Sequence, residues 1–303
     1  MTGYEALREH AAWIDRSARG KIRLTGEDRA RLLHAMTTNQ IQALTPGEGC
    51  YTFFLNAQGR ILADANVLCE AESMLLDTEP ETRERVFQHL DQFIIADDVT
   101  LEDVTEALAT IAIEGPQAGA VLTNFGAPVP DAEQSWQAWG NRMVLRASAT
   151  GWMVFVPMVE KQSLIKALDT IPQADAEAAR TVRIENGVPR YGDELTERFL
   201  VQETGQMRAV NFTKGCYVGQ EIVERVRSRG QVHRHLKPVQ IEGQDVPPVG
   251  VKLTAGGKEL AEIVSAAYSP ALGKVVAMAY VRTDAATPGF ALQWGGAAAL
   301  VGG

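Results

Sequence analysis

The chain has 303 residues, of which 46% are hydrophobic and 22% are charged, and its formal net charge is −9. This composition is typical of a globular protein of about two domains, and its acidity argues against general nucleic-acid binding, which depends on neutralising phosphates. No stretch approaches the roughly 18 apolar residues of a membrane span. Three cysteines without a C-x-x-C pair argue against a disulfide framework, and the N-terminus lacks a secretory pattern, so we expect a cytoplasmic protein.

The first half of the chain alternates between strand-like and helix-like patterns. Apolar runs predict strands, and apolar residues at helical spacing predict helices that begin after residues 28, 80 and 115. The expected strands are 21–24, 50–55, 61–68, 74–77, 98–104 and 109–113.

The second half predicts three more strands, at 136–139, 142–146 and 152–157, and helices at 160–168 and 174–186. From about residue 231 the pattern changes to short apolar strands with Gly and Pro, which is typical of a small β-barrel. Strict β-α-β alternation is absent, so we expect an α+β fold with antiparallel sheets. The predicted domains are 1–230, with two interleaved α+β modules, and a C-terminal β-barrel at 231–303.

The most informative stretch is Lys-Gly-Cys-Tyr-Val-Gly-Gln-Glu at 214–221. Glycines on both sides of Cys216 let another molecule approach the backbone, and the ammonium of Lys214 would favour the reactive thiolate. The alternative is a small buried cysteine that serves packing alone, which is how we interpret Cys50 and Cys69. Cys216 is therefore the candidate functional thiol, with Lys214 tuning its charge.

Two further stretches contain carboxylates beside turns. Glu185 lies near the end of a predicted helix, and its two oxygens suit the 2-amino-pyrimidinone edge of a pterin or a guanine. Asp64 follows a predicted hairpin turn at 56–59. Taken alone, each has an ordinary alternative, a solvated helix end for Glu185 and a plain β-turn before Asp64.

Together these stretches resemble one family. Arg-x-Glu-x-Gly at 183–187, Tyr-Gly at 191–192 and the cysteine motif at 214–221 resemble the YgfZ branch of the glycine cleavage T-protein superfamily. Leu-Asn-Ala-Gln-Gly-Arg at 55–60 and Tyr-Ser-Pro-Ala-Leu-Gly at 268–273 fit the same resemblance, which runs from about 21 to 294.

The resemblance implies a ring-like arrangement of the two modules and the barrel around a central pocket for tetrahydrofolate or a one-carbon derivative. It implies that Glu185 binds the pterin and that Tyr51 lines the pocket, and we add Tyr191, Gln220 and Asp64 as folate-binding candidates.

The T-protein's catalytic aspartate is expected where this chain has Ala63, and alanine can neither take a proton nor stabilise a developing charge. A shift of one residue along a strand turns Asp64 to the opposite face. Whether the protein is an enzyme is therefore left open, and aminomethyl transfer by the T-protein mechanism is not expected.

The leading hypothesis from the resemblance is a folate-binding accessory factor for the assembly or repair of iron–sulfur proteins, including tRNA-modifying enzymes, that works through Cys216. Its partners would be folate and iron–sulfur client or assembly proteins. The second hypothesis is a tetrahydrofolate-dependent aminomethyltransferase or demethylase that uses Asp64.

The third hypothesis is direct RNA binding, which the acidic composition argues against. It would use a basic stretch, since 208–237 holds seven Lys or Arg and two Glu. If 225–229 is extended, Arg225, Arg227 and Arg229 project from one face. The alternatives are a solvated edge, or a surface that binds the glutamate tail of a folate or an acidic partner. His233 and His235 could share a face, but no metal site is expected.

Overall fold

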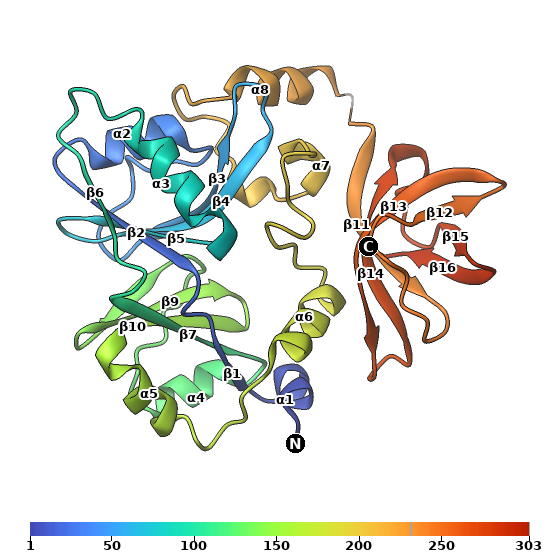
Figure 1. The fold of residues 1–303 in the computed structure, drawn as a ribbon, viewed down its shortest axis with the longest axis horizontal. Coiled ribbons are helices and arrows are strands. Elements are labelled where there is room, and N and C mark those ends of the chain that lie inside the picture. The colour runs from blue at the N-terminus through green and yellow to red at the C-terminus, as the bar shows by residue number, and fades with distance from the viewer. Residues whose placement is uncertain (231, 303) are drawn as a thin grey trace. The chain divides into compact units, whose positions relative to one another are not determined.

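The computed structural model describes residues 1–230 and 232–302. The chain divides into two compact units, each built from separate stretches of sequence (Figure 1). The first unit comprises Met1–Ala57, Leu62–Ala176 and Arg208–Gln220, and the second comprises Gln58–Ile61, Glu177–Met207 and Glu221–Gly303. The predicted start of the barrel domain, Gln231, lies outside the described residues, as does Gly303, and the division at 230/231 stays a prediction.

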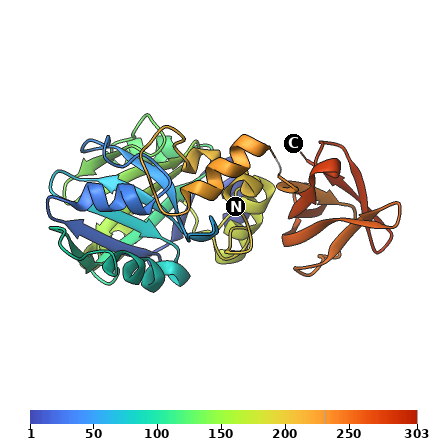
Figure 2. The ribbon, with the colours of Figure 1, turned by 90° about the horizontal axis from the view of Figure 1, so that it is seen from above.

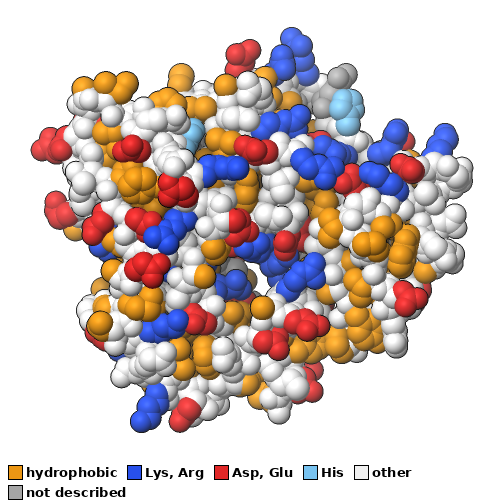
Figure 3. Space-filling model, in the orientation of Figure 1, with side chains coloured by type: hydrophobic (Ala, Val, Ile, Leu, Met, Phe, Trp, Pro, Cys, Tyr) orange, Lys and Arg blue, Asp and Glu red, His pale blue; other side chains and the backbone are white. Residues whose placement is uncertain are grey.

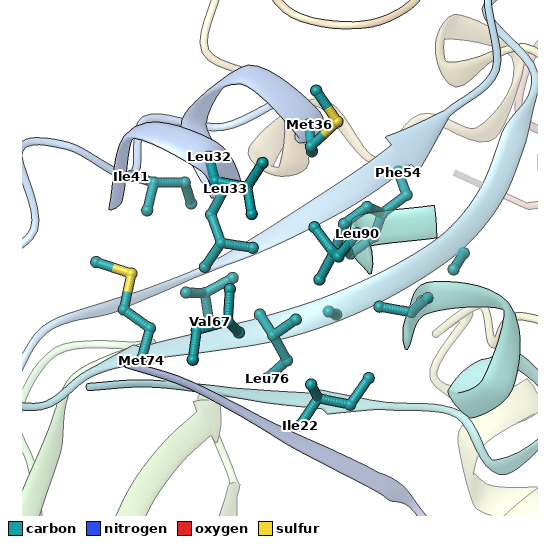
Figure 4. Close-up of a cluster of buried hydrophobic side chains, with 14 of the residues drawn as sticks. Ile22, Leu32, Leu33, Met36, Ile41, Phe54, Val67, Met74, Leu76 and Leu90 are labelled. Atoms are coloured by element: carbon teal, nitrogen blue, oxygen red, sulfur yellow. The ribbon is translucent and has the colours of Figure 1, made fainter. Parts of the chain in front are cut away.

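One antiparallel sheet of the first unit carries two helices on its outer face. Its strand order is β3 (Gly49–Leu55), β4 (Ile61–Cys69), β5 (Met74–Thr78), β2 (Gly20–Thr25) and β6 (Thr100–Asp103). The helices are α2 (Arg29–Met36) and α3 (Arg83–Asp91), the latter preceded by the short η1 (Pro80–Thr82). Figure 4 shows Leu32 and Leu33 of α2 pointing toward Val67 and Leu76 of the sheet, in the apolar cluster that joins the two layers.

A second antiparallel sheet completes the first unit. Its strand order is β1 (Ala12–Asp15), β7 (Leu108–Glu114), β10 (Gly151–Pro157), β9 (Arg142–Ser148) and β8 (Trp136–Trp139). The helical elements of this half are α1 (Gly3–Glu9), α4 (Ala118–Asn124), η2 (Met158–Glu160) and α5 (Lys161–Ala167). Leu122 of α4 and Leu164 of α5 belong to the apolar cluster that covers this sheet.

The two sheets of the first unit face each other. Leu68 and Leu75 of one sheet lie in one apolar cluster with Leu145 and Phe155 of the other. The unit therefore has four layers, with α2 and α3 outside one sheet and α4 and α5 outside the other (Figures 1 and 2). In this arrangement a polar side chain that points between the sheets is hidden from water.

The second unit contains a closed six-stranded barrel. Its strand order is β11 (Arg234–Ile241), β14 (Lys274–Arg282), β13 (Lys258–Ser269), β12 (Lys252–Ala255), β15 (Ala291–Trp294) and β16 (Ala297–Val301). The helical elements of the later chain are α6 (Ala176–Glu185), α7 (Val201–Thr204), η3 (Met207–Ala209), α8 (Gln220–Arg229) and η4 (Thr283–Ala285). The predicted class is confirmed, namely α+β with two antiparallel sheets and a C-terminal barrel. The predicted ring around a central pocket stays a prediction.

The extended alternative for the basic stretch is wrong, because residues 220–229 form α8. In a helix, Arg225 and Arg229 lie on one face, whereas Arg227 points elsewhere and lies 3.5 Å from Glu224. The helix was not recognised from sequence because Val223 is its one fully buried residue, so the apolar period is faint. All three arginines are exposed, and Figure 3 shows Lys and Arg side chains around the end of α8 and the start of β11.

Candidate functional site

The alternation of side chains along β4 decides which of its residues can do chemistry. Ala63 is 0% exposed and belongs to the apolar cluster beneath α2 and α3. Asp64 is 6% exposed and points to the opposite face. A carboxylate at position 63 would therefore point into hydrocarbon, and Ala63 is what this packing position needs. The loss of an acid–base group, which we inferred from Ala63, does not follow, since the carboxylate to consider is Asp64.

One carboxylate oxygen of Asp64 accepts a hydrogen bond from a described residue, and the other does not. The Tyr51 hydroxyl of β3 donates to Asp64 Oδ2 at 2.7 Å, whereas Oδ1 has no hydrogen-bond partner among the described residues. Burial, and next the negative charge of Glu79, raises the pKa of Asp64 to about 6. Burial and Asp64 also raise the pKa of Tyr51, so the phenol stays protonated and remains the donor. Asp64 is therefore a buried acid that exchanges its proton near neutral pH.

Tyr51 links this acid to the surface. It is half-buried, and the exposed guanidinium of Arg208 lies over its ring at 4.7 Å from the centroid. The Asn39 amide donates to the main-chain oxygens of both Tyr51 and Arg208, at 2.8 and 3.0 Å, which fixes the two segments together. Arg208 forms no ion pair with any residue that the structure describes, so its charge is available to a ligand.

Other charged side chains on the same face of this sheet are buried beside Asp64. We call them the polar row, and it consists of Arg19, Lys21, Asp64, Asn66, Asp77 and Glu79. Arg19 donates to both carboxylate oxygens of Asp77, at 2.8 and 3.0 Å, and to Glu79. Asn66 donates to Asp77 at 2.9 Å. Buried charges are tolerated when they are paired in this way.

Arg208 and most of the polar row were not predicted from the sequence. A signal was present, because Lys21 and Asp77 are charges inside otherwise apolar strands. Such charges are rarely buried unless paired, which marks them as members of a network. Their partners were not predictable, because the register between strands is set by the three-dimensional fold.

The cysteine loop lies on α2. Cys216 is exposed, so it does not serve core packing, whereas Cys69 is buried as expected and Cys50 is half-buried against the same apolar cluster as α2. On one side of the thiol, Lys214 is buried. On the other side, the Val218 N–H donates to the Ala35 carbonyl of α2 at 3.2 Å. The thiol is thus presented at the top of a loop that is held at both ends.

Lys214 is bonded to the backbone of α2 and of the segment that follows it. Its ammonium donates to the carbonyls of His34, Thr37 and Asn39, the last two at 2.6 and 2.8 Å. These carbonyls lie at and beyond the C-terminal end of α2, where helix carbonyls lack partners within the helix. Burial lowers the pKa of Lys214 to about 8, so the side chain stays charged at neutral pH. Lys214 therefore fixes the cysteine loop to α2 through three backbone hydrogen bonds, and its predicted effect on the charge of the thiol stays a prediction.

The remaining predicted site residues divide between the units. Gln220 is half-buried at the start of α8, and its N–H donates to the Tyr217 carbonyl at 3.2 Å. In the second unit, Glu185 is half-buried at the end of α6, and Gly187 follows with the positive φ of a helix C-terminus. Tyr191 is buried, and its hydroxyl donates to the Ile61 carbonyl at 3.4 Å. Tyr51, Asp64 and Cys216 all belong to the first unit.

Two kinds of site find no support in the part of the chain that the structure describes. No group of three His, Cys, Asp or Glu side chains there could hold a metal ion. Within the same residues, no helix has the length and apolar character needed to span a membrane.

Comparisons with known proteins find matches to two family models that together span nearly the whole chain. Residues 2–214 match the family described as GCVT N-terminal domain, and residues 234–295 match the glycine cleavage T-protein C-terminal barrel domain. An aminomethyltransferase of Streptomyces coelicolor is 30% identical over 94% of this chain and 82% of its own length. A putative chloroplastic transferase of Arabidopsis thaliana is 25% identical over 91% of this chain and 66% of its own.

A solved structure shares the fold. The crystal structure of the glycine cleavage system aminomethyltransferase T from Bartonella henselae superposes with a TM-score of 0.89 at 20% identity. The match covers 99% of this chain and 87% of that one. At this identity the likeness establishes the architecture and not the reaction.

Asp64→Asn is expected to make the protein more stable at neutral pH. A folded-state pKa of about 6 exceeds the usual value of 3.8, so the folded protein holds this proton more tightly than the unfolded chain. The stability that this proton provides is complete below about pH 4 and is lost as pH rises through about 6, a loss of up to about 3 kcal/mol. Urea unfolding should show the smaller difference at pH 4.5, about 1 kcal/mol or less, and a variant up to about 3 kcal/mol more stable at pH 7.5.

The matched control is Asp169→Asn, because Asp169 is an exposed aspartate of the same unit. A stability difference that stays constant from pH 4.5 to 7.5 in Asp64→Asn would contradict the raised pKa.

Lys214→Met is expected to destabilise the first unit without changing how alkylation of Cys216 depends on pH. The variant leaves three carbonyls without their donor, and each unsatisfied buried group costs roughly 1–3 kcal/mol, so we expect a loss of at least about 2 kcal/mol. Urea unfolding and iodoacetamide alkylation between pH 6 and 10 check the two parts, with the exposed Lys166→Met as control. Unchanged stability with alkylation shifted to higher pH would return Lys214 to the predicted charge-tuning role.

Proposed function

The chain belongs to the glycine cleavage T-protein family, and we propose that within it the protein is a tetrahydrofolate-binding factor of the YgfZ branch that supports the assembly or repair of iron–sulfur proteins. The observation that carries the proposal is the cysteine loop. Cys216 is exposed, while Lys214 and Val218 on either side fix the loop to α2. A packing cysteine needs no such support, whereas a thiol that meets a partner protein or its iron benefits from a fixed position.

The residues present suit a folate. The open Oδ1 of Asp64 is a buried acceptor without a donor, and a folate nitrogen that carries hydrogen would supply one. Tyr51 offers a ring, and Arg208 offers a cation for the carboxylates of the folate tail. The assignment of Glu185 to the pterin edge comes from the family resemblance. Tyr191 and Gln220 complete the proposed set. Tetrahydrofolate, when bound, supplies nitrogens that carry one-carbon units.

A second candidate function is transfer of an aminomethyl or methyl group to tetrahydrofolate. It is favoured by one observation, namely that Asp64 is a buried acid with a pKa of about 6 and one unbonded oxygen. General acid–base catalysis works best when the pKa of the group lies near the working pH. Relatives named aminomethyltransferase agree with this candidate.

Partners follow from the leading proposal. Iron–sulfur client or assembly proteins, including tRNA-modifying enzymes, would meet the protein at the Cys216 loop. Direct RNA binding is not part of the proposal, since the chain is acidic overall and Arg225 and Arg227 do not share one helical face.

Glu185→Ala is expected to weaken tetrahydrofolate binding about tenfold or more, because it removes a charged acceptor of two hydrogen bonds. Calorimetric titration of anaerobic tetrahydrofolate into wild type and variant measures this. The matched control is Glu177→Ala, which removes an exposed glutamate from the start of the same helix. Equal affinity in wild type and Glu185→Ala would show that the glutamate was wrongly assigned.

Cys216→Ser and Asp64→Asn are expected to separate the two candidate functions. Each variant, and wild type, restores the gene in a deletion strain under oxidative stress, and the activities of iron–sulfur enzymes are measured at equal protein levels. The leading proposal expects rescue by wild type and loss of most of the rescue in Cys216→Ser. In Asp64→Asn the amide oxygen can still accept a hydrogen bond from the folate, so this variant should retain more of the rescue than Cys216→Ser. Rescue by Cys216→Ser together with failure of Asp64→Asn would favour the transferase.

A further inference from the structure

The polar row contains one carboxylate more than it has cations. Asp64, Asp77 and Glu79 are its acids, and Arg19 and Lys21 are its cations. Arg19 is occupied by two of the acids, since it bonds both oxygens of Asp77 and also Glu79. The row is therefore short of one positive charge when all its groups are ionised. An unmatched charge of this kind is costly away from water.

The strand register shows why Asp64 is the unmatched group. Gly20 pairs with Thr78 and Ala65 also pairs with Thr78, so one further step along each pairing places Arg19 and Asp64 on either side of Glu79. Glu79 thus lies between the Arg19 guanidinium and the Asp64 carboxylate, and it forms an ion pair with Arg19. Asp64 receives repulsion from Glu79 and one hydrogen bond from Tyr51.

No other described group supplies the missing charge. From β2, the Lys21 ammonium donates to the Ser17 carbonyl at 2.6 Å rather than to Asp64. From β5, the Thr78 hydroxyl donates to the main-chain oxygen of Asp64. From η3, Arg208 lies over the Tyr51 ring. Asp77 adds a further repulsion from β5, and Arg19 an attraction from beyond Glu79.

We propose that the polar row holds one exchangeable proton on Asp64, and that Glu79 and Arg19 are positioning residues that set, in opposite directions, the pH at which this proton leaves. Glu79 retains the proton by repelling the carboxylate that its loss would create. Arg19 promotes loss of the proton by stabilising that carboxylate. Both act through Asp64, since Arg19 bonds Asp77 and Glu79 rather than Asp64.

The titration of Asp64 itself tests the proposal and needs no ligand. Protein labelled with ¹³C at aspartate carboxyl groups is followed by NMR between pH 4 and 9, and Asp64→Asn identifies the signal. Glu79→Gln is expected to lower the midpoint by about one pH unit, the usual size for loss of a neighbouring like charge. Glu79→Asp keeps the charge and should restore most of the wild-type midpoint. Glu81→Gln, an exposed change two residues away, should leave it unaltered.

Arg19→Gln tests the opposite direction independently and is expected to raise the midpoint by about one pH unit. The two variants remove charges of opposite sign, so either one alone decides the matter if the other does not fold. A folded Glu79→Gln whose midpoint is unchanged or higher overturns the proposal. A folded Arg19→Gln whose midpoint is unchanged or lower does the same.

A ligand that suits Asp64 has an N–H donor or a charged nitrogen to place at Oδ1. This inference rests on the folate proposal and extends it. Tetrahydrofolate binding at pH 6 should then release a fraction of a proton in wild type and none in Asp64→Asn. Calorimetry in two buffers of different ionisation enthalpy measures this release. Binding without release overturns the ligand assignment, and absence of binding overturns the proposed function, while the titration separately decides the roles of Glu79 and Arg19.

Discussion

Arg19 allows one sheet of this protein to bury charge on one face and hydrocarbon on the other. Its guanidinium bonds Asp77 and Glu79 together, and the planar fork of five N–H donors makes it the side chain suited to such a pairing. Without this cation, three carboxylates would share a space hidden from water. While Asp64 holds its proton, the two cations of the row match its two remaining carboxylates.

The same sheet shows how period-two alternation separates structure from chemistry. Ala63 and Asp64 are adjacent in sequence, yet one packs beneath two helices and the other joins the polar row. We inferred the loss of an acid–base group from Ala63, but Ala63 lies on the face of the strand that packs against the helices. For a strand, the face to which a residue belongs has to be known before an absent acid is interpreted.

Local pattern predicted most of the fold and only part of the site. The strands around Asp64 and the helix that ends at Glu185 were predictable because they depend on the apolar period and on turn residues, and both signals are local in sequence. The hydrogen-bond partners of Lys214 could not be predicted from its neighbours in sequence. Its partners are the carbonyls of residues 34, 37 and 39, and nothing in a linear pattern connects them. The polar row was missed for the same reason, since Arg19 and Glu79 meet only across paired strands.

The first unit is completed by a segment that comes late in the chain. Residues 208–220 return to it after the chain has passed through part of the second unit, and Lys214 closes a loop of 175 to 180 residues onto α2. Contacts so distant in sequence form slowly, because a long loop has to close before they are gained. During synthesis, residues 1–176, which hold most of the first unit, therefore leave the ribosome before residues 208–220, which complete it. The exposed thiol of Cys216 therefore reaches its fixed position only once the chain has folded back onto α2.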